Sequence, residues 1–540
     1  MNQPGSAVPA ALGAGSPFVQ ATDTAASASS TATPAHLLAG LTGADPDSFA
    51  DVDVLVIPSI SLDATQLESV SGAIHYEERM LVNLGWLRQP TTRVVYLTSQ
   101  PLVPELIEYH LQLIPGIPTN HARRRLLLRS VSDASPRPLT QKVLERPRFL
   151  ARLRAALRPG RSLLVCFNVT ELEERLARAL GLPLLGTSPS LHTFGSKSGS
   201  RALFRRCGLP LPRGMEQLPD RAAVAEAAVG LVGQAAETGS AIEQVIVKLE
   251  DGFSGEGNAL LDLRPLLDGS RLDRRRLHTA LMDNLIPMAG GLNAAAFWDL
   301  FEREGGVLEE RVRGQGFCSP SVQLYLHPDR RVEVVSTHDQ VLGGADDQVY
   351  LGCRFPARSI YRQQLHQMGL TVGQALAAEG AMDRCAVDTI AFHDPEAEGA
   401  WKVLAIEINL RKGGTTHPLV ALQQLTGGRY ELPSGCYRAD GQVKRYIATD
   451  NLCSNAYRGL LPEDLMEMVA ERGHIFDAHT RRGVVFLMVG ALSEHGKLGL
   501  TCIDNSLAGS EHMLERVRAD LDNLAADSAG TPLAMAPHWH

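Results

Sequence analysis

One stretch, between Cys385 and Pro418, constrains the fold and chemistry of this chain more than any other. Residues 386–392 and 403–410 are largely apolar, and the turn between them is rich in Asp, Glu and Gly, which predicts two antiparallel strands. On the second strand, the alternation of a pleated backbone places Glu407 and Asn409 on one face, opposite the apolar side chains. The stretch therefore predicts a half-buried strand pair with a polar face.

The first of these strands carries a single carboxylate, Asp388, inside an apolar run, where an unpaired charge is costly. With Glu407 and Asn409 it forms an all-oxygen donor set suited to Mg²⁺, or to Mn²⁺, held jointly with substrate phosphates. Arg411 would face the same ligand and can form paired hydrogen bonds to a phosphate or a carboxylate. Short motifs also match by chance, so an ordinary strand with its polar face in water is the alternative.

The totals of the chain favour a protein of several domains that acts on small molecules. A length of 540 residues predicts three or four domains, and the hydrophobic content of 44% with 21% charged residues is typical of globular proteins. A net charge of −8 argues against nucleic acid or an anionic membrane as the partner, and no apolar run approaches the length of a membrane span. Eight separated cysteines without a C-x-x-C pair disfavour a disulfide framework and a zinc site, and favour the reducing cytoplasm.

Composition along the chain predicts five segments. Residues 1–47 contain no Lys or Arg, so we expect a disordered tail there rather than a secretory signal or a transit peptide. Alternating strands and helices predict a parallel α/β domain over 48–190. We expect a further domain over 191–430, to which the resemblance described below assigns nucleotide binding and catalysis, a small α+β module over 431–527 and a second tail over 528–540.

A basic stretch lies between residues 123 and 161, with twelve Arg or Lys residues and only two acids, Asp133 and Glu145. Such a stretch is compatible with a nucleic-acid-binding patch. In a chain of net negative charge we favour the alternative, a solvated helix face.

Two lysines occur in settings that suit phosphate binding. Lys197 follows Gly195 at the start of a predicted helix, and Lys248 lies on the predicted strand 245–249, just before a glycine-rich loop. Glycines let backbone N–H groups approach phosphates closely, although a simple hairpin turn is the alternative. The loop residues in question are Gly252, Ser254, Gly255 and Gly257.

In their order and content these features resemble the ATP-grasp superfamily, over roughly residues 50–430. The features that carry this resemblance are Lys197, the G-L-P-L-P run at 208–212, Lys248 with its loop, the apolar strand at 308–312, Asp388 and the Glu407–Asn409 pair. Within the superfamily the chain resembles the pheganomycin-type peptide ligases and their carboxylate–amine ligase relatives. The closer likeness lies in I-H-Y-E-E-R at 74–79, F-G-S-K-S-G-S-R at 194–201, Y-L-G-C-R-F-P at 350–356 and E-I-N-L-R-K-G-G-T-T-H-P at 407–418.

The resemblance implies a multidomain protein of α/β and α+β class: a pre-ATP-grasp α/β domain, a two-lobed ATP-grasp fold and a small C-terminal α+β module. It implies an ATP-dependent ligase that joins a small-molecule or peptide carboxylate to an amine through an acylphosphate, with release of ADP and phosphate, in peptide natural-product biosynthesis. It also makes a homodimer plausible. The alternatives are a relative that uses another nucleophile, and a catalytically silent ATP-binding protein.

The resemblance also implies roles for single residues. Asp388, Glu407 and Asn409 would hold the metal, and Lys197 and Lys248 would bind the α- and β-phosphates of ATP. The glycine loop would cover the phosphates as a lid. The adenosine would lie among Glu309, Glu310 and Val312.

The remaining roles concern the substrates. Arg411 would hold the γ-phosphate or the acylphosphate. A loop would bind the acid or orient the amine, and its residues are Gly413, Gly414, Thr415 and Thr416. His417 is a candidate general base, against a structural role. Arg354 is a candidate partner for a substrate carboxylate, against a plain surface ion pair.

Overall fold

The computed structural model describes residues 38, 49–62, 64–251, 257–269, 271–288, 292–343, 349–394, 399–432 and 434–530. Three of the loop residues expected to cover the phosphates, Gly252, Ser254 and Gly255, lie outside these ranges. So do most of the two expected tails. The described chain forms three main sheets, one from each of three successive parts of the sequence.

The N-terminal part is a five-stranded parallel sheet, as the alternating pattern predicts. In spatial order its strands are β3 (Leu126–Ser130), β2 (Arg93–Thr98), β1 (Asp53–Ile57), β4 (Ser162–Cys166) and β5 (Leu184–Leu185). Alternate residues of β1 belong to two different hydrophobic clusters, since helices cover both faces. The helical elements of this part are α2 (Ala64–Ser69), η2 (Ala73–Arg88), α3 (Pro104–Gln112), α4 (Thr119–Arg123), α5 (Leu139–Leu144), α6 (Pro147–Ala156) and α7 (Glu171–Leu180). Element η2 is a 3₁₀ helix of 16 residues.

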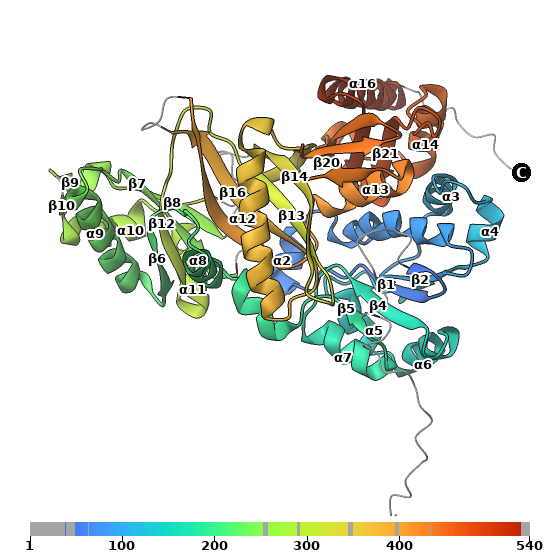
Figure 1. The fold of residues 1–540 in the computed structure, drawn as a ribbon, viewed down its shortest axis with the longest axis horizontal. Coiled ribbons are helices and arrows are strands. Elements are labelled where there is room, and N and C mark those ends of the chain that lie inside the picture. The colour runs from blue at the N-terminus through green and yellow to red at the C-terminus, as the bar shows by residue number, and fades with distance from the viewer. Residues whose placement is uncertain are drawn as a thin grey trace, which may run out of the picture.

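The second part is a small lobe around an antiparallel sheet of five strands, at the left of Figure 1. Its strands, in spatial order, are β11 (Ile286–Pro287), β8 (Asn258–Asp262), β7 (Gln244–Leu249), β12 (Gly306–Glu310) and β6 (Gly214–Leu218). Three helices bury one face of this sheet: α9 (Arg221–Glu237), α10 (Arg274–Asp283) and α11 (Ala294–Glu304). The short 3₁₀ turn η3 (Pro189–Gly195) and helix α8 (Lys197–Arg206) precede the lobe in the chain, and α8 contacts both β12 and β17.

The third part is a ten-stranded, mainly antiparallel sheet in the middle and upper right of Figure 1. Its main path runs through β17 (Trp401–Asn409), β16 (Asp383–His393), β13 (Pro320–Leu326), β14 (Val332–Gly343), β15 (Val349–Phe355), β20 (Gln442–Cys453), β19 (Cys436–Ala439) and β18 (Arg429–Glu431). Strand β22 (Lys497–Asp504) pairs with both β20 and β21 (Gly483–Leu487). The helices of this part are α12 (Ser359–Ala378), which packs on β13 and β14, α13 (Thr416–Thr426), α14 (Pro462–Glu471), α15 (Leu492–His495) and α16 (Leu507–Gly530).

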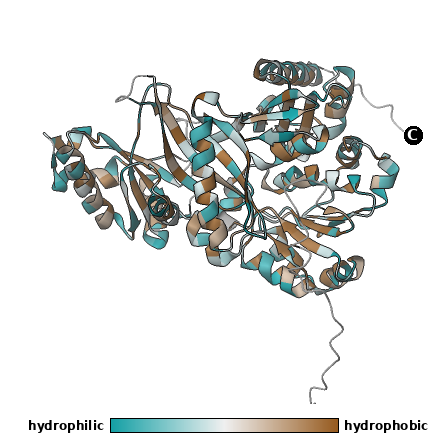
Figure 2. Cartoon of the chain, viewed as in Figure 1, coloured by the Kyte–Doolittle hydropathy of each residue, from teal (hydrophilic) through white to brown (hydrophobic). Residues whose placement is uncertain are grey.

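The C-terminal segment 431–527 shares its sheet and its core with its neighbours. Strand β20 pairs with β15, so one sheet continues across residue 430. One hydrophobic cluster joins Val56 and Leu84 of the N-terminal part to Val484 and Leu521 of the C-terminal part. Strand interiors are brown and outer helix faces are largely teal in Figure 2, in keeping with a core that runs between these layers.

The basic stretch 123–161 contains β3, α5 and α6, and several of its arginines form ion pairs. Arg146 lies 2.9 Å from Asp133, Arg137 lies 2.8 Å from Glu145, and Arg158 Nε donates to the buried Asp53 at 2.8 Å. This pairing is what a solvated helix face with local counter-ions predicts. None of the helices that the structure describes is both long and apolar enough to cross a bilayer.

Candidate active site

A cleft of about 1920 Å³ lies where the small lobe, the large sheet and the N-terminal part meet. Nine of the sixteen predicted site residues that the structure describes line it together, although they come from distant parts of the chain. These are Lys197, Lys248, Asp388, Glu407, Asn409, Arg411, Gly413, Gly414 and Thr415.

The two predicted carboxylates of this cleft face each other across a strand pair. Strands β16 and β17 are antiparallel as predicted, with Asp388 opposite Glu407. A β-bulge follows at this point, and as a result both Ile406 and Glu407 line the cleft. The Asn409 amide nitrogen donates to Asp388 Oδ2 at 2.7 Å, and the Gln340 amide nitrogen donates to Oδ1 at 2.8 Å.

The electrostatics of Asp388 suit a cation. Burial, and then the neighbouring charge of Glu407, raise the pKa of the Asp388 carboxyl to about 7. Its two hydrogen-bond partners are neutral amides, which do not offset a negative charge. A buried, all-oxygen group of two carboxylates and an amide is a donor set that fits Mg²⁺ or Mn²⁺.

Both predicted lysines are buried and held by carboxylates. Lys197, the first residue of α8, places its Nζ 2.6 Å from Glu407 Oε1. Lys248, on β7, places its Nζ 2.5 Å from Glu309 Oε2, and Arg201 Nη1 lies 2.6 Å from the other oxygen of Glu309. Burial alone would raise the pKa of Glu309, but the charges of Lys248 and Arg201 outweigh it and lower that pKa. Both lysines are therefore fixed in the wall of the cleft without a ligand.

Two of the residues predicted to contact the adenosine, Glu310 and Val312, line a separate hollow rather than the cleft. Glu310 forms an ion pair with Arg213 at 2.6 Å, and it borders a second hollow of about 800 Å³ together with Val312. Val312 packs on an apolar cluster that includes Ile390 and, at its edge, Ile406, which itself lines the cleft. Gly257, at the end of the glycine loop, precedes β8.

The predicted substrate loop separates the cleft from a second cavity behind it. Gly414 lies against Tyr350 so closely that a Cβ atom there would be 2.7 Å from the tyrosine ring, which explains the glycine. Thr416 accepts a hydrogen bond from the Gly413 N–H at 3.0 Å and donates to Gln323 at 3.3 Å. Thr416 lines the rear cavity rather than the cleft.

His417 also faces the rear cavity, where it is buried. Its Nε2 lies 2.8 Å from Asp450 Oδ1, and Arg79 Nη1 donates to Asp450 Oδ2 at 3.0 Å. Burial would raise the pKa of Asp450, but His417 and Arg79 together hold it well below its usual range. This placement favours the structural role of His417 over that of a general base.

Arg354 lies outside the cleft. Its Nε donates to Glu511 Oε1 of α16 at 2.8 Å, and its side chain is 40% exposed. The structure thus favours the surface ion pair that was the alternative for this residue.

Several residues that line the cleft are absent from the sequence-based prediction of the site. Lys497 Nζ donates to the Tyr76 hydroxyl at 2.9 Å, and the Arg79 guanidinium lies 4.3 Å from the centre of the Tyr76 ring. With Asp450 and Asn451 of β20, they form the end of the cleft remote from Lys248. The I-H-Y-E-E-R run contains Tyr76 and Arg79 and could have suggested them, whereas no local signal indicates Asp450.

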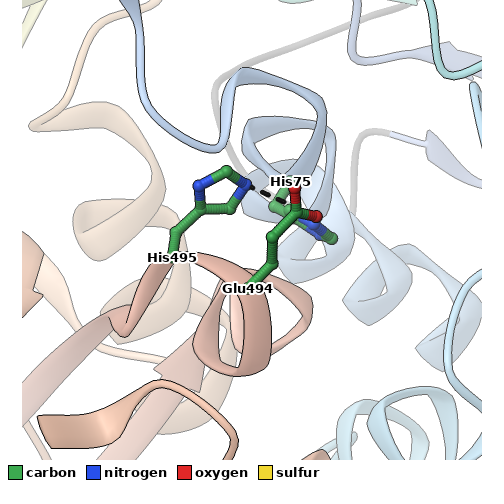
Figure 3. Close-up of side chains that lie close together, drawn as sticks. All are labelled: His75, Glu494 and His495. Carbon is green, nitrogen blue, oxygen red and sulfur yellow. Dashed lines mark ion pairs between the residues drawn. The ribbon is translucent and has the colours of Figure 1, made fainter. Parts of the chain in front are cut away.

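A second group of possible metal ligands, His75, Glu494 and His495, joins η2 to α15 (Figure 3). Each histidine has a partner for Nδ1, namely Glu78 at 2.9 Å and Ser71 at 3.3 Å. His495 Nε2 lies 3.7 Å from Glu494, and the ligand atoms of the group all lie within 4.8 Å of one another. None of the three residues lines the catalytic cleft.

Comparison with known proteins shows which family this chain resembles. Family models match a pre-ATP-grasp domain at residues 86–182, an IQCH-like ATP-grasp domain at 293–431 and a PGM1 C-terminal domain at 464–517. The L-propargylglycine–L-glutamate ligase of Streptantibioticus cattleyicolor is 31% identical over 82% of this chain and 88% of its own length.

Two more distant similarities agree in fold. The IQ motif-containing protein H of Danio rerio is 23% identical over 85% of this chain, which spans only about half (47%) of that longer protein. The crystal structure of a biotin carboxylase in complex with a β,γ-ATP compound, from Campylobacter jejuni, superposes with a TM-score of 0.52 at 11% identity, over 90% of this chain and 96% of its own. The predicted fold class, with a pre-ATP-grasp domain, an ATP-grasp fold and a C-terminal α+β segment, is confirmed. On the strength of the ligase relative and the two ATP-grasp models, the chain belongs to the ATP-grasp family of carboxylate–amine ligases.

Proposed function

We propose that this protein joins a carboxylic acid to an amine through an acylphosphate, with cleavage of ATP to ADP and phosphate. The observation that carries the proposal is the half-buried Asp388–Glu407 pair, which lies in one cleft with two fixed lysines and Arg411. A carboxylate does not react with an amine at neutral pH, because its leaving group would be an oxide. Transfer of the γ-phosphoryl group to a carboxylate oxygen releases ADP and makes phosphate the leaving group. The amine nitrogen then bonds to the acyl carbon and loses a proton as phosphate departs.

We assign the metal to Asp388, Glu407 and Asn409, whose donor set and uncompensated charge suit Mg²⁺ or Mn²⁺. When bound, the ion neutralises phosphate charge and polarises the γ-phosphoryl group. Lys197 already lies beside Glu407. The site therefore contains a positively charged group that can bind phosphate before ATP arrives. Positioning and electrostatics supply most of the catalysis in this proposal.

We assign Lys197 and Lys248 to the ATP phosphates, with the loop that ends at Gly257 as their lid. Glu309 would act as a positioning residue, because it fixes the Lys248 ammonium at 2.5 Å. The adenine would rest on the apolar cluster of β16 and β17, to which Val312 is packed from behind. Glu310 would contribute through its backbone, since its carboxylate is taken by Arg213.

The substrates would meet between Arg411 and the end of the cleft formed by the C-terminal strands. Arg411 would hold the acylphosphate, while the loop Gly413–Thr415 would receive the acid. Arg79 and Lys497 would attract the carboxylate of an incoming amino acid or peptide. We propose an amino-acid-like or guanidino-acid-like acid and an amino acid or peptide as amine; the relative whose name joins propargylglycine to glutamate supports amino acids as the two substrates. Peptide natural products are the pathway class that we propose, in the cytoplasm and with a homodimer as the assembly.

The test is phosphate release from ATP and Mg²⁺ with pooled amino acids and short peptides, followed by mass spectrometry. We expect ADP and a product that weighs the sum of two substrates minus water. Formation of AMP and pyrophosphate would contradict the acylphosphate route. A thioester or ester product would indicate another nucleophile, and ATP binding without turnover on any pool would favour the silent alternative.

A further inference from the structure

A second cavity of about 680 Å³ lies behind the loop Gly413–His417, between η2, α13 and the strands β13 and β16. It is lined by a different set of residues from the catalytic cleft, but the two share Arg79, Phe167 and Gly413. A ligand that reaches from the cleft past Gly413 would therefore enter this rear cavity.

One charge in the rear cavity lacks a counter-ion. Arg384 is 7% exposed and forms no direct ion pair with a carboxylate in the described ranges, although the charges of Asp383 and Glu333 act on it from farther away. Its Nη2 donates only a long hydrogen bond, 3.4 Å, to Gln423, and its Nη1 has no partner there. The adjacent Asp383 is engaged by Lys412 instead. Burial of an unpaired guanidinium is costly, and an anion is the group that offsets the cost.

Three further buried side chains of the cavity wall carry polar atoms with no partner in the part of the chain that is described. They are the Tyr325 hydroxyl, the Gln424 amide nitrogen and Nε of Arg79. All three can donate a hydrogen bond, and buried donors are rarely left without an acceptor in folded proteins. A carboxylate has two oxygens with about four acceptor positions, which matches a wall rich in donors.

Beside its polar residues the wall has a group of apolar side chains, among them Trp86, Val165, Leu185 and Val420. Such a wall suits a hydrocarbon body and gives a freely hydrated inorganic anion nothing to pack against. The hydrogen-bond donors and the apolar side chains of the wall together suit a ligand with a carboxylate on an apolar stem.

We propose that the rear cavity is a specificity subsite that binds a substrate carboxylate on an apolar stem, with Arg384 as its principal cation. This inference rests on the ligase function proposed above. The carboxylate in question is remote from the reacting group, which stays in the catalytic cleft on the other side of Gly413. The ligase would then select a substrate that carries both a reacting group and a second, unreacted acid.

A binding experiment on the full-length protein tests the subsite without any turnover. Hexanoate is the probe. Hexanamide, which has the same apolar stem but no charge, is the matched control ligand. We expect hexanoate to raise the melting temperature of the wild-type protein and to bind by calorimetry, and Arg384→Met to weaken its affinity at least tenfold. Arg264→Met, which removes an exposed arginine paired only with Asp262, is the control and should bind hexanoate as the wild type does. Equal affinity for hexanamide, or unchanged affinity in Arg384→Met, overturns the proposal.

Arg384→Met should remain folded, because methionine fills much of the same volume and removes a buried charge. If it does not, Tyr325→Phe and Gln424→Leu each remove one donor and should each weaken hexanoate binding.

Kinetics then separate a substrate subsite from an effector site. We expect Arg384→Met to raise KM for one of the two ligase substrates at least tenfold with kcat within threefold, and hexanoate to compete with that substrate alone. Hexanoate binding that competes with neither substrate would make the cavity an effector site and overturn the subsite. Absence of all ligase turnover, with hexanoate binding intact, would instead contradict the proposed function.

Discussion

Two buried carboxylates on the walls of the same cleft, Asp388 and Asp450, have opposite surroundings. Asp388 faces another carboxylate and is hydrogen-bonded by two amides, so its pKa rises to about 7. Asp450 lies between Arg79 and His417, which hold its pKa well below the usual range. The difference separates a carboxylate whose hydrogen-bond partners are neutral amides from one that is held directly by Arg79 and His417.

This difference predicts different roles for Asp388 and Asp450. An acid without a counter-ion is a place for a ligand's cation, and Asp388 lies on the strand pair to which we assign the metal. An acid with two counter-ions joins the elements that supply them, and Asp450 ties η2 and α13 to β20. The rear cavity shows the opposite case, because Arg384 is a buried cation that forms no direct ion pair with a carboxylate in the described part of the chain.

The largest effect that we expect is on catalysis, from Glu407→Gln. Loss of one carboxylate from the metal site should lower Mg²⁺-dependent turnover by at least about 10³-fold, or about 4 kcal/mol, and leave the fold intact. Initial rates of phosphate release measure it. Glu494→Gln changes a carboxylate that is 79% exposed and lies outside the cleft, and should keep wild-type activity. Wild-type turnover by Glu407→Gln would refute the metal assignment.

The next effect is on stability, from Asp450→Asn. This variant leaves the Arg79 guanidinium buried without its anion, which should cost about 3 kcal/mol of unfolding free energy. Asp388→Asn in metal-free protein at pH 8 should be neutral or stabilising, because burial and the charge of Glu407 disfavour the ionised Asp388 more than the nearby cations favour it. Urea unfolding monitored by circular dichroism compares the two. Equal destabilisation by both variants would abolish the distinction between these carboxylates.

A smaller effect is expected on ATP binding, from Lys248→Met. Methionine keeps the apolar stem and removes the ammonium, so affinity for ATP should fall about 100-fold, or about 2.7 kcal/mol, if Lys248 binds phosphate. Isothermal titration calorimetry with a non-hydrolysable ATP analogue measures this affinity. Lys497→Met, at the opposite end of the cleft, should leave ATP affinity as it is and weaken binding of the amine substrate. Unchanged ATP affinity in Lys248→Met would remove Lys248 from the phosphate site.

The residues that could be predicted from the sequence are those whose signal is local. Asp388 stands out because it interrupts an apolar run, and Glu407 and Asn409 because they alternate with isoleucines. Lys248 stands out beside its glycines, and all of these residues line one cleft. For Asp388, Glu407 and Asn409, strand periodicity and chemistry coincide on two neighbouring strands.

The residues that could not be predicted depend on partners far away in sequence. Strand β20 carries Lys444, Arg445 and Asp450, so its composition does not suggest a buried strand. Lys444 is satisfied by the Thr480 carbonyl and Asn505, and Asp450 by two residues from other parts of the chain. Only the assembled sheet shows that these charges are compensated. The predicted boundary at 430 falls inside β18 (Arg429–Glu431), which pairs with β19 of the segment that follows.

The smallest effect that we expect is a dependence of stability on pH that differs in sign between the two carboxylates. The folded-state pKa of Asp388, about 7, is raised above the ordinary value, so its contribution to stability is full below about pH 4 and is lost as pH rises through 7. The pKa of Asp450 is lowered, so its contribution is present above about pH 4 and is lost as pH falls further. In metal-free protein, the stability gained by Asp388→Asn over the wild type should therefore grow by about 2 kcal/mol between pH 5 and pH 8. Asp450→Asn should show a constant deficit over the same range, and unfolding in urea at four pH values with EDTA measures both. A stability gain of Asp388→Asn that stays flat from pH 5 to pH 8 would mean that Asp388 is ionised throughout and already has its cation within the protein.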